Sequence, residues 1–137
     1  MSSSQVRRSP IEASRSGTVL VIDSDRELGQ SLRRVIQEFR LSLLGCERSA
    51  RDLKLGAVAP PDVVLVNLSA SELGLELLPE MRQLWPSARV IFLADWNNMH
   101  LYVDAIKLGA YDFLPKPLDT RDLGTVIWDA SSTLLLN

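Results

Sequence analysis

The chain is poor in cysteine and histidine and lacks a long apolar run, and each shortage excludes a class of protein. Cys46 is the only cysteine, so a disulfide framework within the chain is excluded. His100 is the only histidine, which excludes a zinc site built from clustered His and Cys ligands. No apolar run approaches the ~18 residues of a membrane span. With 137 residues, 46% of them hydrophobic, the chain has the size and composition of one soluble globular domain.

Charge divides the chain into a short basic start and a longer acidic remainder. Residues 1–17 hold three arginines and one glutamate (+2), and the remainder holds twelve basic and sixteen acidic residues (−4). The start is rich in serine and has no apolar stretch, so it is not a secretory signal. We expect residues 1–17 to be a disordered tail and residues 18–137 to form the domain. An acidic domain argues against a nucleic-acid partner, because phosphate contacts supply most of that affinity.

Short apolar runs alternate with amphipathic segments from residue 18 onward. The runs predict strands at 18–22, 41–46, 62–68, 88–94 and 111–114. The segments between them predict helices at 25–39, 49–56, 72–84, 97–108 and about 119–135. Pro79 lies inside the third of these helices, which should therefore kink there or begin near it. Gly109 is expected to close the fourth.

Strict alternation of strand and helix predicts an α/β domain with a parallel sheet and helices on both faces. In such sheets, binding and chemistry occur at the carboxyl ends of the strands. The residues at those ends are Asp23, Ser24, Asp25, Asn67, Ala94, Asp95 and Lys116.

Several common sites are excluded at these strand ends. Neither GxGxxG nor GxxxxGK[ST] follows the first strand, so no dinucleotide or P-loop site is predicted. Asp23 and Asp25 would repel the phosphate of a flavin nucleotide. His100 falls inside a predicted helix, away from the strand ends, and is expected to lie on the surface or to pack. Cys46 is expected to pack as a small apolar side chain.

Three segments carry a family resemblance: VLVIDSD (19–25), PDVVLVNL (61–68) and GAYDFLPKPLD (109–119). With them, residues 18 to about 135 resemble the receiver domain of response regulators. The resemblance implies a flavodoxin-like (βα)5 fold, a doubly wound parallel sheet in the order 2-1-3-4-5 within a three-layer αβα sandwich.

The resemblance also implies a phosphorylation site, which this sequence matches only in part. Family members hold Mg²⁺ with two adjacent acids, accept a phosphoryl group on an Asp after the third strand, and bind it with a Thr or Ser and a Lys. Lys116 matches the Lys, and Phe113 matches an aromatic residue that reports the switch. The remaining positions are occupied by Asp23 and Ser24 (the acids, with Asp25 following), Asn67 (the phosphoacceptor) and Ala94 (the Thr or Ser).

These departures predict a degenerate site that is neither phosphorylated nor enzymatic. An amide lacks the nucleophilic oxygen of a carboxylate, and Mg²⁺ prefers carboxylates, so no cofactor is expected beyond weak Mg²⁺ binding through Asp23 and Asp25. Lys116 would be a partly buried cation, with Asp23 supplying its countercharge and Asn67 a hydrogen bond. The family commonly has a cis Lys-Pro bond at the position of Lys116 and Pro117.

The predicted function is that of an atypical cytoplasmic receiver in two-component phosphorelay signalling, acting by protein–protein interaction. Its partners would be a histidine kinase or an output protein, and a homodimer is a further alternative. The expected contact face is 97–135, with the candidate contacts Trp96, Met99, Leu101, Tyr102 and Trp128.

Two other functions stay open at this point. One is a phosphoaccepting receiver that uses another residue, such as Ser69 or Asp25. The other is a small-molecule sensor with Phe92 and Trp96 lining a pocket. The chain is expected to be either a stand-alone adaptor or part of a longer protein.

Overall fold

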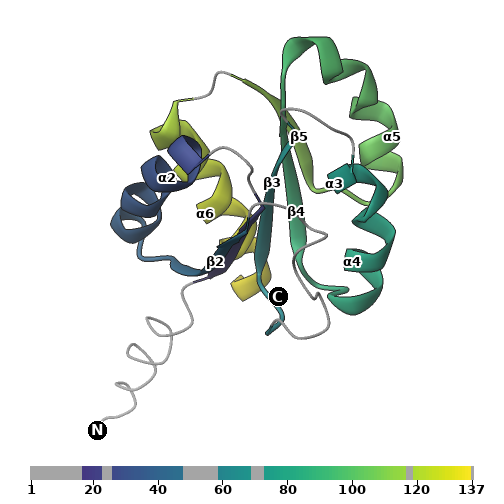
Figure 1. Cartoon of the computed structure of the whole chain (residues 1–137). Coiled ribbons are helices and arrows are strands. Elements are labelled where there is room, and N and C mark those ends of the chain that lie inside the picture. The colour runs from purple at the N-terminus through teal and green to yellow at the C-terminus, as the bar shows by residue number, and fades with distance from the viewer. Residues whose placement is uncertain (1–16, 23–25, 48–58, 69–72, 117–118, 137) are drawn as a thin grey trace, which may run out of the picture.

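The computed structural model describes residues 17–22, 26–47, 59–68, 73–116 and 119–136. Their elements follow one another along the chain as strands and helices (Figure 1). The elements are β1 (Thr18–Ile22), α2 (Arg26–Glu38), β2 (Ser42–Glu47), β3 (Val63–Leu68), α3 (Leu73–Glu76), α4 (Leu78–Leu84), β4 (Arg89–Ala94), the 3₁₀-helix η2 (Trp96–Leu101), α5 (Tyr102–Lys107), β5 (Asp112–Pro115) and α6 (Thr120–Leu136).

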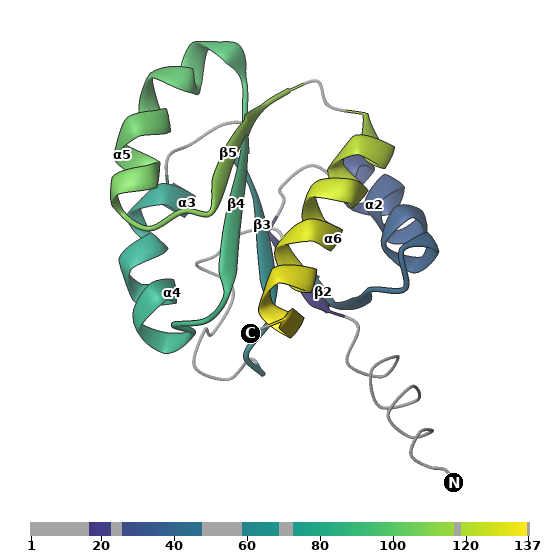
Figure 2. The same ribbon diagram turned by 180° about the vertical axis from the view of Figure 1, so that it is seen from behind.

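The strands form one five-stranded parallel sheet in the order β2-β1-β3-β4-β5. Helices α2 and α6 cover one face of the sheet, and α3, α4 and α5 cover the other (Figures 1 and 2). The predicted α/β fold, its strand order and its three layers are therefore confirmed. Each strand lies within one residue of its predicted bounds.

The three central strands β1, β3 and β4 are buried on both faces because their sequences are apolar at consecutive positions. Val19, Val21, Leu65 and Ile91 point toward α2 and α6, in a core completed by Leu32, Leu123 and Ile127 among others. The alternate strand positions build a second core under α3, α4 and α5, with Phe92 and Phe113 among its largest side chains. Two apolar cores therefore fix the sheet between its helical layers.

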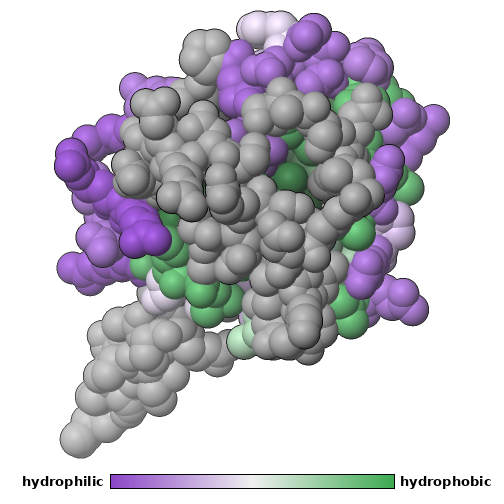
Figure 3. All heavy atoms as spheres, viewed as in Figure 1, coloured by the Kyte–Doolittle hydropathy of each residue, from purple (hydrophilic) through white to green (hydrophobic). Residues whose placement is uncertain are grey.

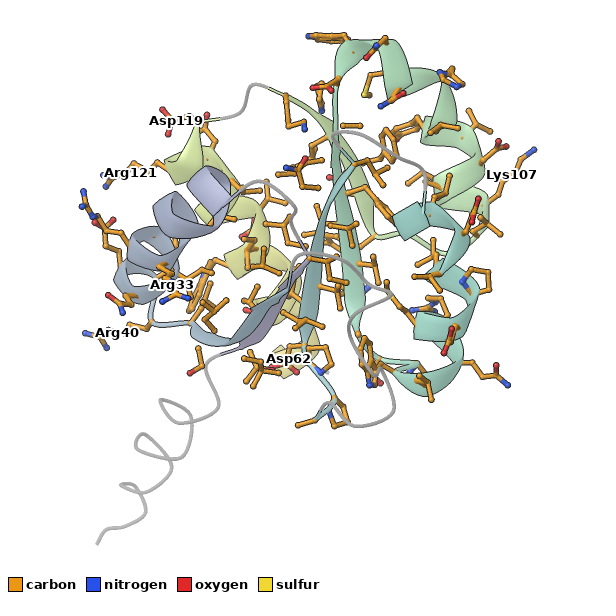
Figure 4. The ribbon with its side chains drawn as sticks, viewed as in Figure 1. Arg33, Arg40, Asp62, Lys107, Asp119 and Arg121 are labelled. Atoms are coloured by element: carbon orange, nitrogen blue, oxygen red, sulfur yellow. The ribbon has the colours of Figure 1, made fainter. Side chains whose placement is uncertain are left out.

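Helix α2 shows how the pattern of the sequence decides which face is buried. Leu32, Val35 and Ile36 are buried, whereas Arg33 and Arg34 are exposed. The hydrophilic surface over this helix is visible at the left of the space-filling view (Figure 3) and in the outward side chain of Arg33 (Figure 4). This division is that of an amphipathic helix lying on a sheet.

The predicted helix at 72–84 is interrupted, as its proline indicated. It is divided into α3 and α4 at Leu77, and Pro79 lies in the first turn of α4. Proline has no N–H to donate, and its ring crowds the preceding turn, so it is tolerated only where a helix begins.

The predicted helix at 97–108 is wrong in its first half. Residues 96–101 form the 3₁₀-helix η2, and α-helical geometry begins only at Tyr102. The N–H of Asn98 donates to the carbonyl of Asp95, three residues earlier, at 2.8 Å. Asparagine is a weak helix former because its side chain competes for backbone partners. Gly109 closes α5 as predicted, with a φ of 107° that side chains disfavour.

Some predictions fall outside the described residues: the tail at 1–16, the helix at 49–56 and the Lys116–Pro117 peptide bond. Gly17, predicted to end the tail, is buried, and its carbonyl accepts the N–H of Ser42 at 2.9 Å. The folded part therefore extends to this residue. Within the described residues, no helix has the length and apolarity that crossing a membrane requires.

Candidate functional site

The candidate site lies where β3, β4 and β5 end, at one edge of the sheet. Asn67 is the penultimate residue of β3, and Ala94 is the last residue of β4. Lys116 directly follows β5, and its backbone N–H donates to the carbonyl of Ala94 at 2.8 Å. The parallel sheet thus brings together three of the residues that the sequence placed in the site.

Lys116 reaches across β4 to the end of β3. Its Nζ donates to Oδ1 of Asn67 at 2.5 Å and lies 3.6 Å from Oδ1 of Asp95. The Lys116 side chain is 20% exposed and that of Asp95 is 48% exposed. The ammonium group therefore has a close hydrogen-bond acceptor and a more distant countercharge.

The predicted hydrogen bond between Lys116 and Asn67 is confirmed, and Lys116 is a partly buried cation as expected. The predicted countercharge, Asp23, lies outside the described residues together with Ser24 and Asp25, so its contact with Lys116 stays a prediction. The sequence placed Asp95 at a strand end but gave it no role. Its position directly after β4 was the only signal.

Ala94 is fully buried and presents only a methyl group. Just beyond it, Nδ2 of Asn98 donates to the carbonyl of Leu68 at 3.4 Å. This contact joins η2 to the last residue of β3. Sequence reasoning missed Asn98, because a residue in an expected helix gives no sign that its side chain reaches back to another strand.

Phe113 points into the core beneath the site and is 2% exposed. Its ring centroid lies 6.0 Å from that of Phe92 and 6.1 Å from that of Tyr102, which meets it edge-on. Tyr102 covers Phe113 from the solvent side, at 43% exposure. The side chain of Phe113 therefore points into the core. Its role as a switch residue stays a prediction.

Phe92 and Trp96, the predicted lining of a pocket, differ in burial. Phe92 is fully buried in the core, whereas Trp96 is 70% exposed on η2. His100 is also exposed on η2, with Nδ1 3.1 Å from the carbonyl oxygen of Asn97. Of the other predicted contact residues, Leu101 is buried, Met99 packs partly into the core, and Trp128 is 38% exposed.

Few candidate metal ligands lie together among the residues that the structure describes. These residues contain no group of three or more His, Cys, Asp or Glu side chains that could hold a metal ion. At the strand ends, the amide oxygen of Asn67 is neutral and already accepts a hydrogen bond from an ammonium group. Mg²⁺ requires oxygen ligands and favours carboxylates. Asp23 and Asp25, the predicted weak ligands, are outside the described residues.

Comparison with known proteins shows which family this chain matches. The family model described as "Response regulator receiver domain" matches residues 19–127. The DNA-binding transcriptional regulator NtrC of Escherichia coli K12 is 33% identical over 117 residues, which are 85% of this chain and 25% of NtrC. The chain thus spans about a quarter of that relative's length.

Solved structures agree in fold. A response regulator receiver domain protein from Clostridium thermocellum superposes with a TM-score of 0.74 at 23% identity, covering 88% of this chain and 98% of the other. A response regulator from Burkholderia pseudomallei, solved with a phosphorylated aspartic acid, calcium ion and citrate, gives 0.69 at 23% identity, covering 88% and 71%.

Proposed function

We propose a function from one premise: this chain belongs to the response regulator receiver domain family. It is a receiver domain of two-component signal transduction, and receiver domains interact with histidine kinases. The proposal is that this receiver transmits its signal by protein contacts, without being phosphorylated at the end of β3. The observation that supports it best is the hydrogen bond from Nζ of Lys116 to Oδ1 of Asn67, at 2.5 Å.

The chemistry at Asn67 argues against phosphoryl transfer. Forming an acyl phosphate requires a carboxylate oxygen that attacks phosphorus while the bond to the donor breaks. The amide oxygen of Asn67 carries no negative charge, and its lone pair accepts a hydrogen bond from Lys116. An attacking oxygen is therefore lacking at the position where the family resemblance places it.

The neighbouring groups support the same conclusion. A phosphoryl group would need a hydroxyl donor at the end of β4, where Ala94 has a buried methyl group. It would also need the ammonium of Lys116, which is bound to Asn67 and lies 3.6 Å from Asp95. We propose that this arrangement holds the site in one state without Mg²⁺, and that the domain is not an enzyme.

The proposed partners are a histidine kinase or an output protein that docks on η2, α5, β5 and α6. Trp96 and Tyr102 support this placement, because large aromatic side chains at 70% and 43% exposure are typical of residues that dominate binding energy. A nucleic-acid partner is not proposed, since the sequence from residue 18 onward is acidic.

Intact-protein mass spectrometry after incubation with acetyl phosphate and Mg²⁺ tests the proposal. We expect no addition of one phosphoryl group to the wild-type chain. A variant that combines Ser24→Asp, Asn67→Asp and Ala94→Thr restores the missing groups, and we expect it to gain a base-labile phosphoryl adduct. Its modification would show that the reagents and the fold are competent.

A base-labile adduct on the wild-type chain that maps to Asn67, Ser69 or Asp25 would overturn the proposal. An adduct at Ser69 or Asp25 would in addition support a receiver with a non-standard phosphoacceptor. Beryllofluoride titration followed by NMR gives an independent reading. Saturable shifts at Asn67 and Lys116 in the wild-type chain would contradict the proposed locked site.

A further inference from the structure

Basic side chains are concentrated on α2 and just after its end, although the domain as a whole is acidic. Arg33, Arg34 and Arg40 are exposed, and Glu38 is the one exposed carboxylate among residues 31–40. In the part of the chain that the structure describes, none of these three arginines makes an ion pair or a side-chain hydrogen bond. Most of the positive charge on this face is therefore not compensated by neighbouring groups.

Arg40 adopts a backbone conformation that glycine favours. Its N–H donates to the carbonyl of Gln37 at 3.0 Å, and the N–H of Leu41 donates to the carbonyl of Ile36 at 2.9 Å. Glycine commonly closes a helix end of this kind, but here the residue is Arg40, with a φ of 59°. Among the described residues, no other side chain is attached at a positive φ. Because a side chain costs stability in this conformation, the presence of arginine points to a use for its charge.

The basic start of the chain joins the fold next to this face. The carbonyl of Gly17 accepts the N–H of Ser42, which is two residues after Arg40. Residues 1–16 contain one glutamate and three arginines, of which Arg15 is the last. Because Arg15 is two residues before Gly17, covalent geometry keeps their Cα atoms within about 7 Å of each other. Six arginines are therefore tethered to one side of the molecule.

Helix α2 lies at an outer margin of the molecule, where its surface is convex. It forms the left margin in Figure 1 and the right margin in the opposite view of Figure 2. Figure 4 labels Arg33 and Arg40 at this margin, with the side chain of Arg40 directed away from the body of the protein. A convex basic face contacts a flat anionic surface along its length, whereas it contacts the convex backbone of a nucleic-acid duplex at few phosphates. The shape therefore favours a planar partner.

We propose that Arg33, Arg34 and Arg40, together with the arginines of residues 1–16, dock this chain on a lipid bilayer with anionic headgroups. Clusters of about four to eight basic residues are typical of proteins that bind such bilayers, and each basic residue near the surface strengthens binding about fivefold. Acidic residues in the opposite helical layer oppose docking little, because physiological salt screens charges beyond ~8 Å. The inference goes beyond the proposed function, and α2 is not among the elements proposed to dock signalling proteins.

Centrifugation of the full chain with lipid vesicles tests this docking. Vesicles of phosphatidylcholine with an equal share of phosphatidylglycerol are compared with vesicles of phosphatidylcholine alone, at an ionic strength of about 0.01 M. We expect binding to the anionic vesicles only. This binding should be lost at about 1 M salt, where the Debye length falls to about 3 Å.

Removal of charge from α2 should weaken binding in steps. We expect Arg40→Gln to lower the partition coefficient about fivefold, and Arg33→Gln/Arg34→Gln/Arg40→Gln to lower it about a hundredfold. Lys107→Gln is the matched control for Arg40→Gln, because it removes the same charge from an exposed position on α5, in the other helical layer. The control should change the partition coefficient less than twofold.

Two further variants separate the charge of this face from its contribution to the fold. Arg40→Gly should weaken binding about fivefold, yet it should raise the midpoint of thermal unfolding, because glycine suits the left-handed conformation. Binding lost through unfolding would be accompanied by a lower midpoint instead. Arg7→Gln/Arg8→Gln/Arg15→Gln should weaken binding more than tenfold.

A wild-type chain that fails to bind anionic vesicles at low salt would overturn the inference. So would equal losses in Arg40→Gln and Lys107→Gln, or undiminished binding when the three arginines of residues 1–16 are replaced. Binding of a short DNA duplex without binding of vesicles would make nucleic acid the partner and would also overturn it. None of these outcomes bears on phosphorylation at Asn67, so failure of bilayer docking and failure of the proposed function are distinguishable.

Discussion

The side chain of Lys116 joins the ends of β5 and β3 by donating from Nζ to Oδ1 of Asn67 at 2.5 Å. The backbone N–H of the same residue donates to the carbonyl of Ala94 at the end of β4. Three neighbouring strands are therefore tied together by one residue at the edge of the sheet where the site lies.

We expect Lys116→Met to lower the free energy of unfolding by about 1–2 kcal/mol, because it leaves a half-buried amide oxygen without this donor. Asn67→Ala should cost a similar amount, and the double variant should cost less than the sum, with a coupling of about 1 kcal/mol. Urea denaturation measures these values.

The control for this cycle is Asp95→Asn. The carboxylate of Asp95 lies 3.6 Å from Nζ of Lys116 and is half exposed, and such pairs contribute little. We expect a change below about 0.5 kcal/mol. Additive losses in Lys116→Met and Asn67→Ala would contradict a direct interaction. A loss at Asp95 equal to that at Asn67 would make the ion pair the main contact.

A second prediction concerns the opposite edge of the sheet, where Asp62 and Thr18 hold the starts of β3 and β1 together. Oδ2 of Asp62 accepts the N–H of Thr18 at 2.9 Å, and Oγ1 of Thr18 accepts the N–H of Asp62 at 3.0 Å. Figure 4 labels Asp62 at this edge. We expect Asp62→Ala to destabilise the fold by about 1–3 kcal/mol, measured by thermal or urea unfolding.

Asp119→Ala serves as a comparison, since Asp119 is an exposed aspartate whose Oδ1 accepts the N–H of Arg121 at 2.7 Å at the start of α6. The loss of this cap should cost about 1 kcal/mol or less. If Asp62→Ala cost no more than Asp119→Ala, the contact with Thr18 would not stabilise the sheet.

The positions of the strands were predictable because local sequence determines them. The runs 19–22 and 63–66 are apolar at consecutive positions, as is typical of a short strand buried on both faces. Alternation with helices then restricts the sheet to parallel pairing. The family resemblance supplied the strand order itself. Element bounds shifted by a residue because hydrogen bonding, rather than hydropathy, ends a strand.

The contacts of the site were harder to predict, because they depend on side chains far apart in the sequence. Lys116 and Asn67 are 49 residues apart, and Thr18 and Asp62 are 44 apart. The former pair followed from the expectation that a partly buried cation needs a partner. The contact between Thr18 and Asp62 was missed, and so were the contacts of Asp95 and of Asn98. Hydropathy and helical periodicity contain no information on which polar groups meet across strands.

A third prediction concerns the aromatic contact between Phe113 and Tyr102. Their rings meet edge-on at 6.1 Å, one buried and the other half exposed. A double-mutant cycle of Phe113→Leu and Tyr102→Leu should give a coupling of about 0.5–1.5 kcal/mol in urea denaturation. A coupling near zero would indicate that Tyr102 does not help to hold Phe113 inward. Tyr111→Leu is the matched control, because the Tyr111 ring lies 5.1 Å from Cζ of Arg89, whereas the ring partners of Phe113 are Phe92 and Tyr102.

The last prediction concerns Gly124, where α6 passes close to α2. A Cβ atom at this position would overlap Cγ1 of Val35 and lie 2.7 Å from Cε1 of Phe39. Alanine is the better helix former by about 1 kcal/mol, but here we expect Gly124→Ala to destabilise the fold by about 1–3 kcal/mol, because the two helices must separate.

Thr125→Ala, at the exposed neighbouring position, should change stability by less than about 0.5 kcal/mol. Adding Val35→Ala to Gly124→Ala should cost less than the sum of the two single losses, since the smaller side chain removes one of the two overlaps. Increased stability of Gly124→Ala in thermal unfolding would show that α2 and α6 are free to move apart, and that this glycine is not required by their packing.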